Sequence, residues 1–229
     1  MAIATFLMAR DAGSDLVLLP IVLAARFQNA ALLRQAAYRF GPEDLRGRRV
    51  GIRAYSQTTG LWLRGSLQEE YGVRPNEVNW VTFEDAHVAS FRDPPWAERA
   101  PAGSDMLAIL REGQLDAAIF GNVVPAAPDL ATVFPDPDAA GQAFLARHHF
   151  MPINHLVVVR AEIARRDGIV RALLDRFRTA GNLFPFGRAA LDQAVTLAVH
   201  YATEQGLLTR ALTLDEVWAG LPPGCEGQP

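Results

Sequence analysis

The residues between positions 53 and 64 have the types and spacing of an anion-binding turn. The run Ser56-Gln57-Thr58-Thr59-Gly60 stands between a strand-like and a helix-like segment. The first backbone N–H groups of a helix have no partner inside the helix, so such a turn binds carboxylates, phosphates and sulfonates. The residues also allow Ser56 or Thr58 to be an ordinary helix cap. The candidate ligand-binding residues here are Arg53, Tyr55, Ser56, Gln57, Thr58, Thr59, Gly60 and Trp62, with Arg64 beside them.

Two elements must position this turn. Residues 48–55 contain the β-branched Val50 and Ile52 and predict a short strand. After the turn, Leu63, Leu67 and Tyr71 recur at the spacing of one helix face. The helix is expected to end at a glycine cap at position 72, and the proline at 75 prevents its resumption.

The charge balance excludes several classes of partner. The chain has 229 residues and a formal net charge of −3, so it lacks the basic excess that nucleic-acid binding requires. No apolar run reaches the roughly 18 residues that span a bilayer. All 22 basic residues are arginine, and planar carboxylate recognition is the natural use of an arginine that faces a ligand.

The same composition limits the available cofactor chemistry. Without lysine the chain cannot form a Schiff base or bind pyridoxal phosphate covalently. Cys225 is the single cysteine and lies in a Pro/Gly-rich tail, which argues against disulfides, zinc clusters and a thiol nucleophile. His148 and His149 are adjacent and have no metal-ligand spacing, so a surface pair is expected. We therefore expect neither a metal nor a cofactor.

Strand-like and helix-like segments alternate along the middle of the chain, which indicates an α/β fold with a mostly parallel sheet. Residues 30–39 allow either a helix or a strand, and 84–103 are expected to form a long loop. Strands are expected at 16–23, 78–83, 115–120 and 156–159, and helices at 2–9, 105–112 (capped by Ser104), 162–182, 188–205 and 213–218.

Several segments resemble a known family. The stretches 45–52 and 113–119 resemble the two-lobed periplasmic-binding-protein type II fold, also called ABC transporter substrate-binding protein-like. Within that fold, the segments 57–73, 78–81 and 152–160 are similar to the 4,5-dihydroxyphthalate decarboxylase-like family. The motif at 57–73 is fairly specific, whereas Gly-x-Leu-Asp-Ala at 113–117 is generic to the fold.

The chain departs from this family in two places. Family members usually have an Arg-Phe-x-x-His-type segment where this chain has Arg26-Phe27-Gln28-Asn29-Ala30, so no histidine can act there. They also look longer at the N-terminus by a strand and a helix. The resemblance therefore predicts one lobe from 1–41 and 161–229, lacking the first N-terminal strand and helix. The second lobe, 42–160, is expected to carry the ligand-binding turn.

The resemblance implies a lyase of aromatic compound catabolism in bacteria, acting on a hydroxylated aromatic carboxylate bound between the lobes. Decarboxylation without a cofactor needs a general acid, and histidine has the most suitable pKa. His155 is the first candidate and His87 the second, although a structural role for His155 is an equal alternative. Arg26 and Asn122 extend the expected substrate-binding set.

The alternative function is a solute-binding protein of an ABC transporter for a small carboxylate or related anion, without catalysis. A cytoplasmic location is expected for the enzyme, and a periplasmic one if a signal peptide precedes the first residue. A small aromatic or carboxylate ligand is the only partner that the sequence indicates. It does not determine the exact substrate or the oligomeric state.

Overall fold

The strand–turn–helix segment forms where the sequence predicts it. The computed structural model of the protein describes residues 1–121, 123–166, 168–181 and 184–227. Strand β3 (Arg49–Ile52) leads through the turn into helix α2 (Thr58–Tyr71). The backbone of Gly72 has φ +65°, in the left-handed region, and its N–H donates to the Gln68 carbonyl at 3.1 Å. This is the glycine C-cap expected at that position.

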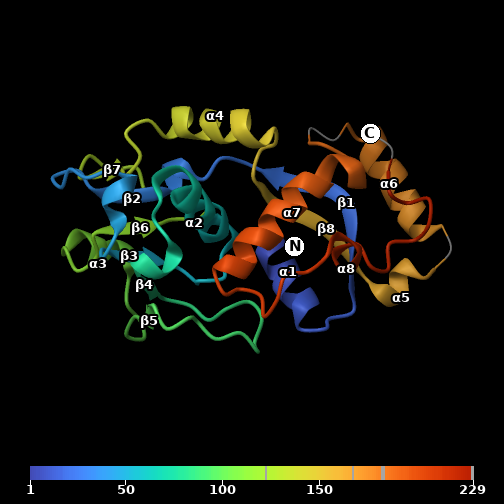
Figure 1. Cartoon of the computed structure of the whole chain (residues 1–229), viewed down its shortest axis with the longest axis horizontal. Helices are drawn as coiled ribbons and strands as arrows, with labels where there is room; N and C mark the ends of the chain where they lie inside the picture. The colour runs from blue at the N-terminus through green and yellow to red at the C-terminus, as the bar shows by residue number, and fades with distance from the viewer. Residues whose placement is uncertain (122, 167, 182–183, 228–229) are drawn as a thin grey trace. The chain divides into compact units, whose positions relative to one another are not determined.

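Strand β3 lies inside a mixed sheet formed by residues 27–151 (Figure 1). The strand order in the described residues is β5-β4-β3-β6-β2-β7. Parallel pairing joins β3 to β4 and β6 and joins β4 to β5, whereas β2 pairs antiparallel with β6 and β7. The expected α/β fold with a mainly parallel sheet is confirmed. The other strands are β2 (Leu32–Gln35), β4 (Asn79–Thr82), β5 (Ala97–Arg99), β6 (Ala117–Ile119) and β7 (Leu130–Thr132).

Alternate residues of β3 face two different helical layers, because side chains alternate across a strand. The Gly51 side of the strand meets Met106 and Leu115, and Met106 opens helix α3 (Met106–Arg111). The Ile52 side meets Gly60 in α2. Helix α4 (Pro137–His148) packs on α2 through Trp62 and Phe144, whose ring centroids are 6.1 Å apart.

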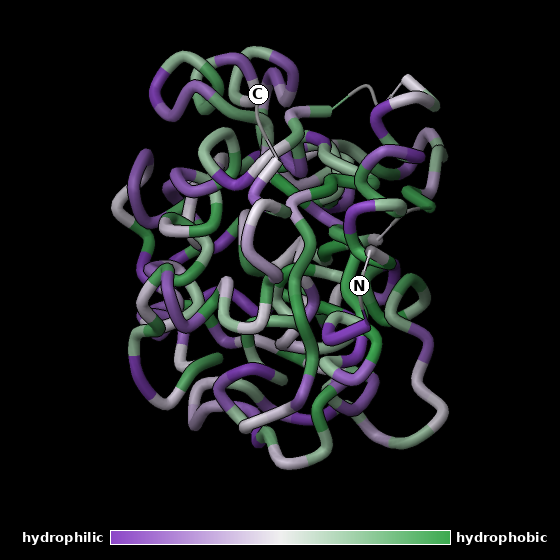
Figure 2. Tube along the Cα trace, turned by 90° about the vertical axis from the view of Figure 1, so that its right-hand side faces the viewer, coloured by the Kyte–Doolittle hydropathy of each residue, from purple (hydrophilic) through white to green (hydrophobic). Residues whose placement is uncertain are grey.

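Residues 1–26 and 152–229 form a separate compact unit, in which strand β1 (Leu16–Ala25) pairs antiparallel with β8 (Ile153–Arg160). The hydrophobic run of β1 forms a core with helix α6, where Val17, Leu19 and Ile21 meet Val170 and Leu174. Figure 2 shows the hydrophobic stretches of the trace that supply such cores. The helices are α1 (Ile3–Asp11), α5 (Ala161–Ala164), α6 (Ile169–Thr179), α7 (Arg188–Glu204) and α8 (Leu214–Val217).

One segment with two open readings is resolved as a strand, and three local expectations are corrected. Residues 30–39 contain strand β2, and the loop 84–103 contains strand β5, because each segment pairs with a neighbouring strand. The expected helix 162–182 is two helices, and the second begins after Gly168, whose φ is +73°. Helix α3 is capped by Asp105 and not by Ser104, since the Asp105 carboxylate accepts from the Ala108 N–H at 2.9 Å.

The two units meet in the sequence at 26/27 and 151/152, whereas the expected lobe boundaries were at 41/42 and 160/161. The difference follows from strand pairing, because β2 joins the central sheet and β8 joins β1. We call Met1–Arg26 with Pro152–Pro229 the terminal unit and Phe27–Met151 the central unit. Within the described residues, every helix is too short or too polar to cross a membrane.

Candidate functional site

The turn before α2 is almost completely buried. Ser56 is 0% exposed and Gln57 is 7% exposed, and Thr58 and Thr59 are equally inaccessible. Gln57 is the N-cap residue of α2, yet its side chain makes no capping hydrogen bond. Within the described residues, the side-chain oxygens Ser56 Oγ and Gln57 Oε1 are buried without a hydrogen-bond partner. Because buried polar groups are nearly always satisfied, these two oxygens are candidates for hydrogen bonds to a ligand.

Arg64 supports the turn from inside the central unit. Its guanidinium donates to the Tyr55 carbonyl at 2.7 Å and lies 4.0 Å from the centroid of the Tyr55 ring and 5.2 Å from that of Trp80. Burial lowers the pKa of Arg64, although an arginine keeps its charge in proteins. An added Cβ on Gly60 would lie 2.8 Å from Arg64 Nη1 and 2.4 Å from Ile52 Cδ1. A side chain at position 60 would therefore require Ile52 and Arg64 to shift.

Tyr55 is held by the fold. Its ring is fully buried and meets the Trp80 ring edge-on, and its hydroxyl accepts from Trp96 Nε1 at 2.9 Å. Burial raises the pKa of the Tyr55 phenol, so the hydroxyl stays protonated at neutral pH. Tyr55 was expected to bind substrate, and these contacts give it a clear role in supporting the turn.

A cavity of about 380 Å³ lies at the carboxyl ends of strands β3, β4 and β6. Arg53 lines this cavity and lies 3.5 Å from the carboxylate of Glu84. Both side chains are about half exposed, so they remain accessible to an anion. Ligands of open α/β sheets bind at this edge of the sheet. The cavity is lined by Arg53, Phe83, Glu84, Ser104, Asp105, Met106, Leu107, Ile119, Phe120 and Gly121.

The sequence predicted Arg53 as a binding residue but did not predict the segment 104–107, which forms another wall of the cavity. The polar Ser104 and Asp105 at the start of α3 are the available signal, but such residues are equally typical of a helix start. Asn122, an expected binding residue, lies outside the described residues.

Trp62 has a packing role. Its side chain is 1% exposed and meets the rings of Phe144 and Phe150 edge-on, at centroid distances of 6.1 Å each. The same cluster includes His148, whose ring centroid is 4.4 Å from that of Phe144. These contacts join α2 to α4 in the central unit.

The two candidate proton donors lie in different units. His155 belongs to β8 in the terminal unit, opposite Ala24 of β1. Burial lowers the pKa of His155, and the positive charges of the chain terminus and Arg26 lower it further. His87 lies in the central unit, exposed in the segment that follows β4. Arg26 is thus an electrostatic neighbour of His155, while the 56–60 turn shares its unit with His87.

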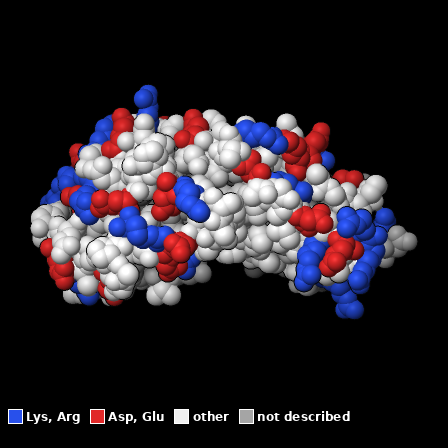
Figure 3. Space-filling view, turned by 90° about the horizontal axis from the view of Figure 1, so that it is seen from below, with Lys and Arg blue, Asp and Glu red and all other residues white. Residues whose placement is uncertain are grey.

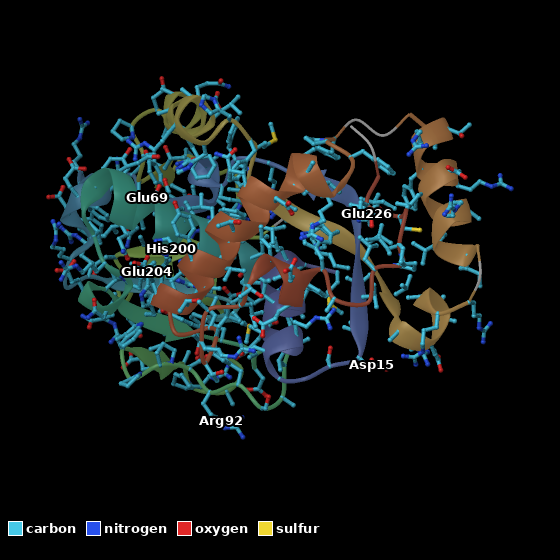
Figure 4. The ribbon with its side chains drawn as sticks, turned by 45° about the vertical axis from the view of Figure 1, so that its right-hand side comes forward. Asp15, Glu69, Arg92, His200, Glu204 and Glu226 are labelled. Atoms are coloured by element: carbon cyan, nitrogen blue, oxygen red, sulfur yellow. The ribbon has the colours of Figure 1, made fainter. Side chains whose placement is uncertain are left out.

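Of the remaining described histidines, two lie near a carboxylate and the third is the C-cap of a helix. His148 Nε2 lies 2.9 Å from Glu69 Oε2. His200 Nε2 lies 3.4 Å from Glu204 Oε2, one turn further along α7 (Figure 4). His149 ends α4 with φ 60°. Across the residues that the structure describes, no group of three or more His, Cys, Asp or Glu side chains has the arrangement of a metal site.

Arginines also gather in the terminal unit around α5 and α6, as Figure 3 shows at its right-hand end. Two cavities of about 520 and 620 Å³ lie there and share Arg171 as a lining residue. Arg165 and Arg166 line the first, and Arg178 lines the second beside Asp175 and Glu226. All four arginines are exposed, so this surface differs from the buried turn before α2.

The arrangement matches a known class of fold. The periplasmic aliphatic sulphonate binding protein SsuA from Escherichia coli superimposes on this chain with a TM-score of 0.53 and 14% sequence identity. The match covers 97% of this chain and 61% of that structure. The chain therefore has the periplasmic-binding-protein-like α/β fold that the sequence predicted.

Two curated proteins with similar sequences are named 4,5-dihydroxyphthalate decarboxylase. The chain is 26% identical over 219 residues to the 4,5-dihydroxyphthalate decarboxylase of Comamonas testosteroni, covering 90% of this chain and 66% of that protein. It is 28% identical over 109 residues to the Pseudomonas putida protein of the same name, covering 42% of each. The chain thus spans less than two thirds of either relative's length. No family model matches the chain.

Proposed function

We propose that this protein is a cofactor-independent decarboxylase of a hydroxylated aromatic dicarboxylate of the 4,5-dihydroxyphthalate type. The observation that carries the proposal is the similarity to the Comamonas protein of that name over 90% of this chain. The buried oxygens of Ser56 and Gln57 beside the start of α2 support it, since they provide polar groups for such a ligand.

The chemistry requires three proton transfers and no redox step. Loss of the proton from the ring hydroxyl para to the leaving carboxylate sends electron density to the carbon that bears this carboxylate. A general acid then protonates that carbon, which forms the new C–H bond. The C–C bond breaks next, carbon dioxide leaves, and the ring regains its aromaticity as a phenolate, which takes a proton back to restore the hydroxyl. The product of 4,5-dihydroxyphthalate is 3,4-dihydroxybenzoate.

The proposed roles follow from residue chemistry. Arg53 and the backbone N–H groups at the start of α2 bind the carboxylate that stays on the ring, with Ser56 donating to it. Gln57, Thr58, Thr59 and Gly60 shape this turn, and Trp62 and Tyr55 keep its supporting layer in place. His155 is the proposed acid, with His87 as the competing candidate and Arg26 as a modulator of His155.

The experiment is a product assay on the purified protein and on a version extended to the length of the relatives. Incubation with 4,5-dihydroxyphthalate in the presence of a metal chelator should release carbon dioxide and 3,4-dihydroxybenzoate in equal amounts. Tight binding of hydroxylated phthalates and benzoates without turnover by either version would contradict the proposal.

That outcome would favour the alternative, a binding protein for a carboxylate or a related anion. One specific observation favours this alternative: the fold is that of a sulphonate-binding protein. The enzyme is proposed to act in the cytoplasm, whereas a receptor of this kind would act in the periplasm.

The Ser56→Ala variant tests the turn. The Ser56 hydroxyl oxygen has no partner among the described residues, so its removal should leave the melting temperature unchanged or slightly higher. Affinity for an aromatic dicarboxylate should fall by about 1.5–3 kcal/mol, the usual contribution of a hydrogen bond to a charged acceptor. Calorimetric titration and thermal melting measure both quantities. An unchanged affinity would remove Ser56 from the binding site.

A further inference from the structure

The side chain of Gln57 presents an acceptor that the fold does not use. Its backbone carbonyl accepts a hydrogen bond from the Leu61 N–H at 3.0 Å, in the first turn of α2. Gln57 is 7% exposed, and its side chain makes no capping bond. Among the described residues, no donor reaches Gln57 Oε1. A buried acceptor without a donor is destabilising unless a ligand supplies one.

Gln57 lies next to the cavity at the carboxyl ends of the parallel strands. Its Nε2 atom is 3.1 Å from the position that a Cβ on Gly121 would occupy, and Gly121 lines the cavity. The Gln57 amide therefore packs against the backbone in the cavity wall, where a side chain at position 121 would crowd it. Arg53 lines the same cavity and supplies a positive charge.

The chemistry of an amide oxygen decides what it recognises. It accepts hydrogen bonds and cannot donate them, and ionised carboxylates and sulfonates also only accept. Neither anion satisfies Gln57 Oε1, whereas a hydroxyl on the ligand does. We propose that Gln57 accepts a hydrogen bond from a ligand hydroxyl and thereby selects hydroxylated acids over the same acids without that hydroxyl.

The aromatic identity of the ligand rests on the proposed function, but the selection for a hydroxyl does not. Ser56 Oγ can donate to the anionic group, because a hydroxyl both donates and accepts. The two neighbouring side chains thus bind different groups of the ligand. Ser56 donates a hydrogen bond to the anionic group, and Gln57 accepts one from the hydroxyl.

Calorimetric titration of the wild type and of Gln57→Met tests the proposal with two matched pairs of ligands. One pair is phthalate and 4,5-dihydroxyphthalate; the other is ethanesulfonate and 2-hydroxyethanesulfonate. The wild type should prefer the hydroxylated member of a pair by roughly 5- to 100-fold, the range expected for leaving a buried acceptor unpaired. Gln57→Met should bind the plain acid as the wild type does and lose this preference.

Gln57→Glu is the matched control, since it keeps an acceptor at the same place. This variant should bind all anions more weakly because of charge repulsion, yet keep the preference for a hydroxyl. If Gln57→Met melts far below the wild type, the Gln57→Glu variant is used instead. A retained preference for the hydroxylated ligand supports the proposal, and a lost preference overturns it.

The outcomes separate this proposal from the proposed function. The protein could bind only the sulfonate pair, and Gln57→Met could lose the preference for the hydroxylated sulfonate. That result would support the role of Gln57 and contradict the proposed decarboxylase. Equal weakening of both members of a pair, or a preference that survives in Gln57→Met, would overturn the role of Gln57. Failure to bind either pair would overturn both proposals.

Discussion

The Trp62→Ala variant is expected to lose about 3–5 kcal/mol of unfolding free energy, the usual cost of removing a large buried aromatic side chain. Trp62 is 1% exposed and meets Phe144 and Phe150, so truncation leaves a cavity between α2 and α4. Because α2 begins directly after the 56–60 turn, the loss should also loosen that turn. Urea denaturation monitored by circular dichroism measures the effect.

The control for this variant is Trp62→Phe, which keeps an aromatic ring and should lose much less. Trp62 was also a candidate for stacking on the ligand. A stability loss below about 1 kcal/mol, together with a strong loss of ligand affinity, would favour stacking over packing.

The His155→Gln variant should slow decarboxylation by about 10²–10⁴-fold, the usual contribution of a general acid. His200→Gln is the matched control, because His200 lies exposed on α7 beside Glu204 and should leave the rate unchanged. His87→Gln tests the competing candidate. If His87→Gln is slow and His155→Gln is fully active, His87 is the general acid.

The pH dependence provides a second measurement of the same role. A general acid works in its protonated form, so kcat/KM should fall as pH rises through the pKa of His155 in the free protein. Burial and the neighbouring positive charges hold that pKa below its usual value of 6.5. Arg26→Gln removes one of these charges and should move the descending limb to higher pH. If the descending limb of the kcat/KM profile lies at the same pH in Arg26→Gln as in the wild type, another group donates the proton.

The parts of the fold that could be predicted are those with local signals. The strand before the turn has β-branched residues, and α2 has its apolar face and the Gly72 cap within its own segment. Strand β2 has no such signal, since residues 32–35 favour a helix by propensity and become a strand by pairing with β6 and β7. Strand β5 contains Glu98 and Arg99, which are poor strand formers, and it forms because Ala97 pairs with Trp80.

The site could be predicted only in part, for a similar reason. The sequence indicated residues 53–62 because their types and order are contiguous. It could not show that Tyr55 meets Trp96, or that Trp62 meets Phe144 and Phe150, because these partners are distant along the chain. Nor could it show which oxygens of the turn stay unpaired, since that depends on every neighbour in the folded chain.

The discontinuous terminal unit constrains how the protein folds during synthesis. Strand β1 pairs with β8, and the Arg26 N–H donates to the Pro152 carbonyl at 3.0 Å, so the central unit is an insertion between two touching points of the chain. Translation delivers the whole central unit before β8 exists, and domains fold as they emerge from the ribosome. Until then β1 is an apolar strand with an unpaired edge, the kind of segment that aggregates. In the nascent chain, β1 is therefore open to aggregation until β8 has been synthesised.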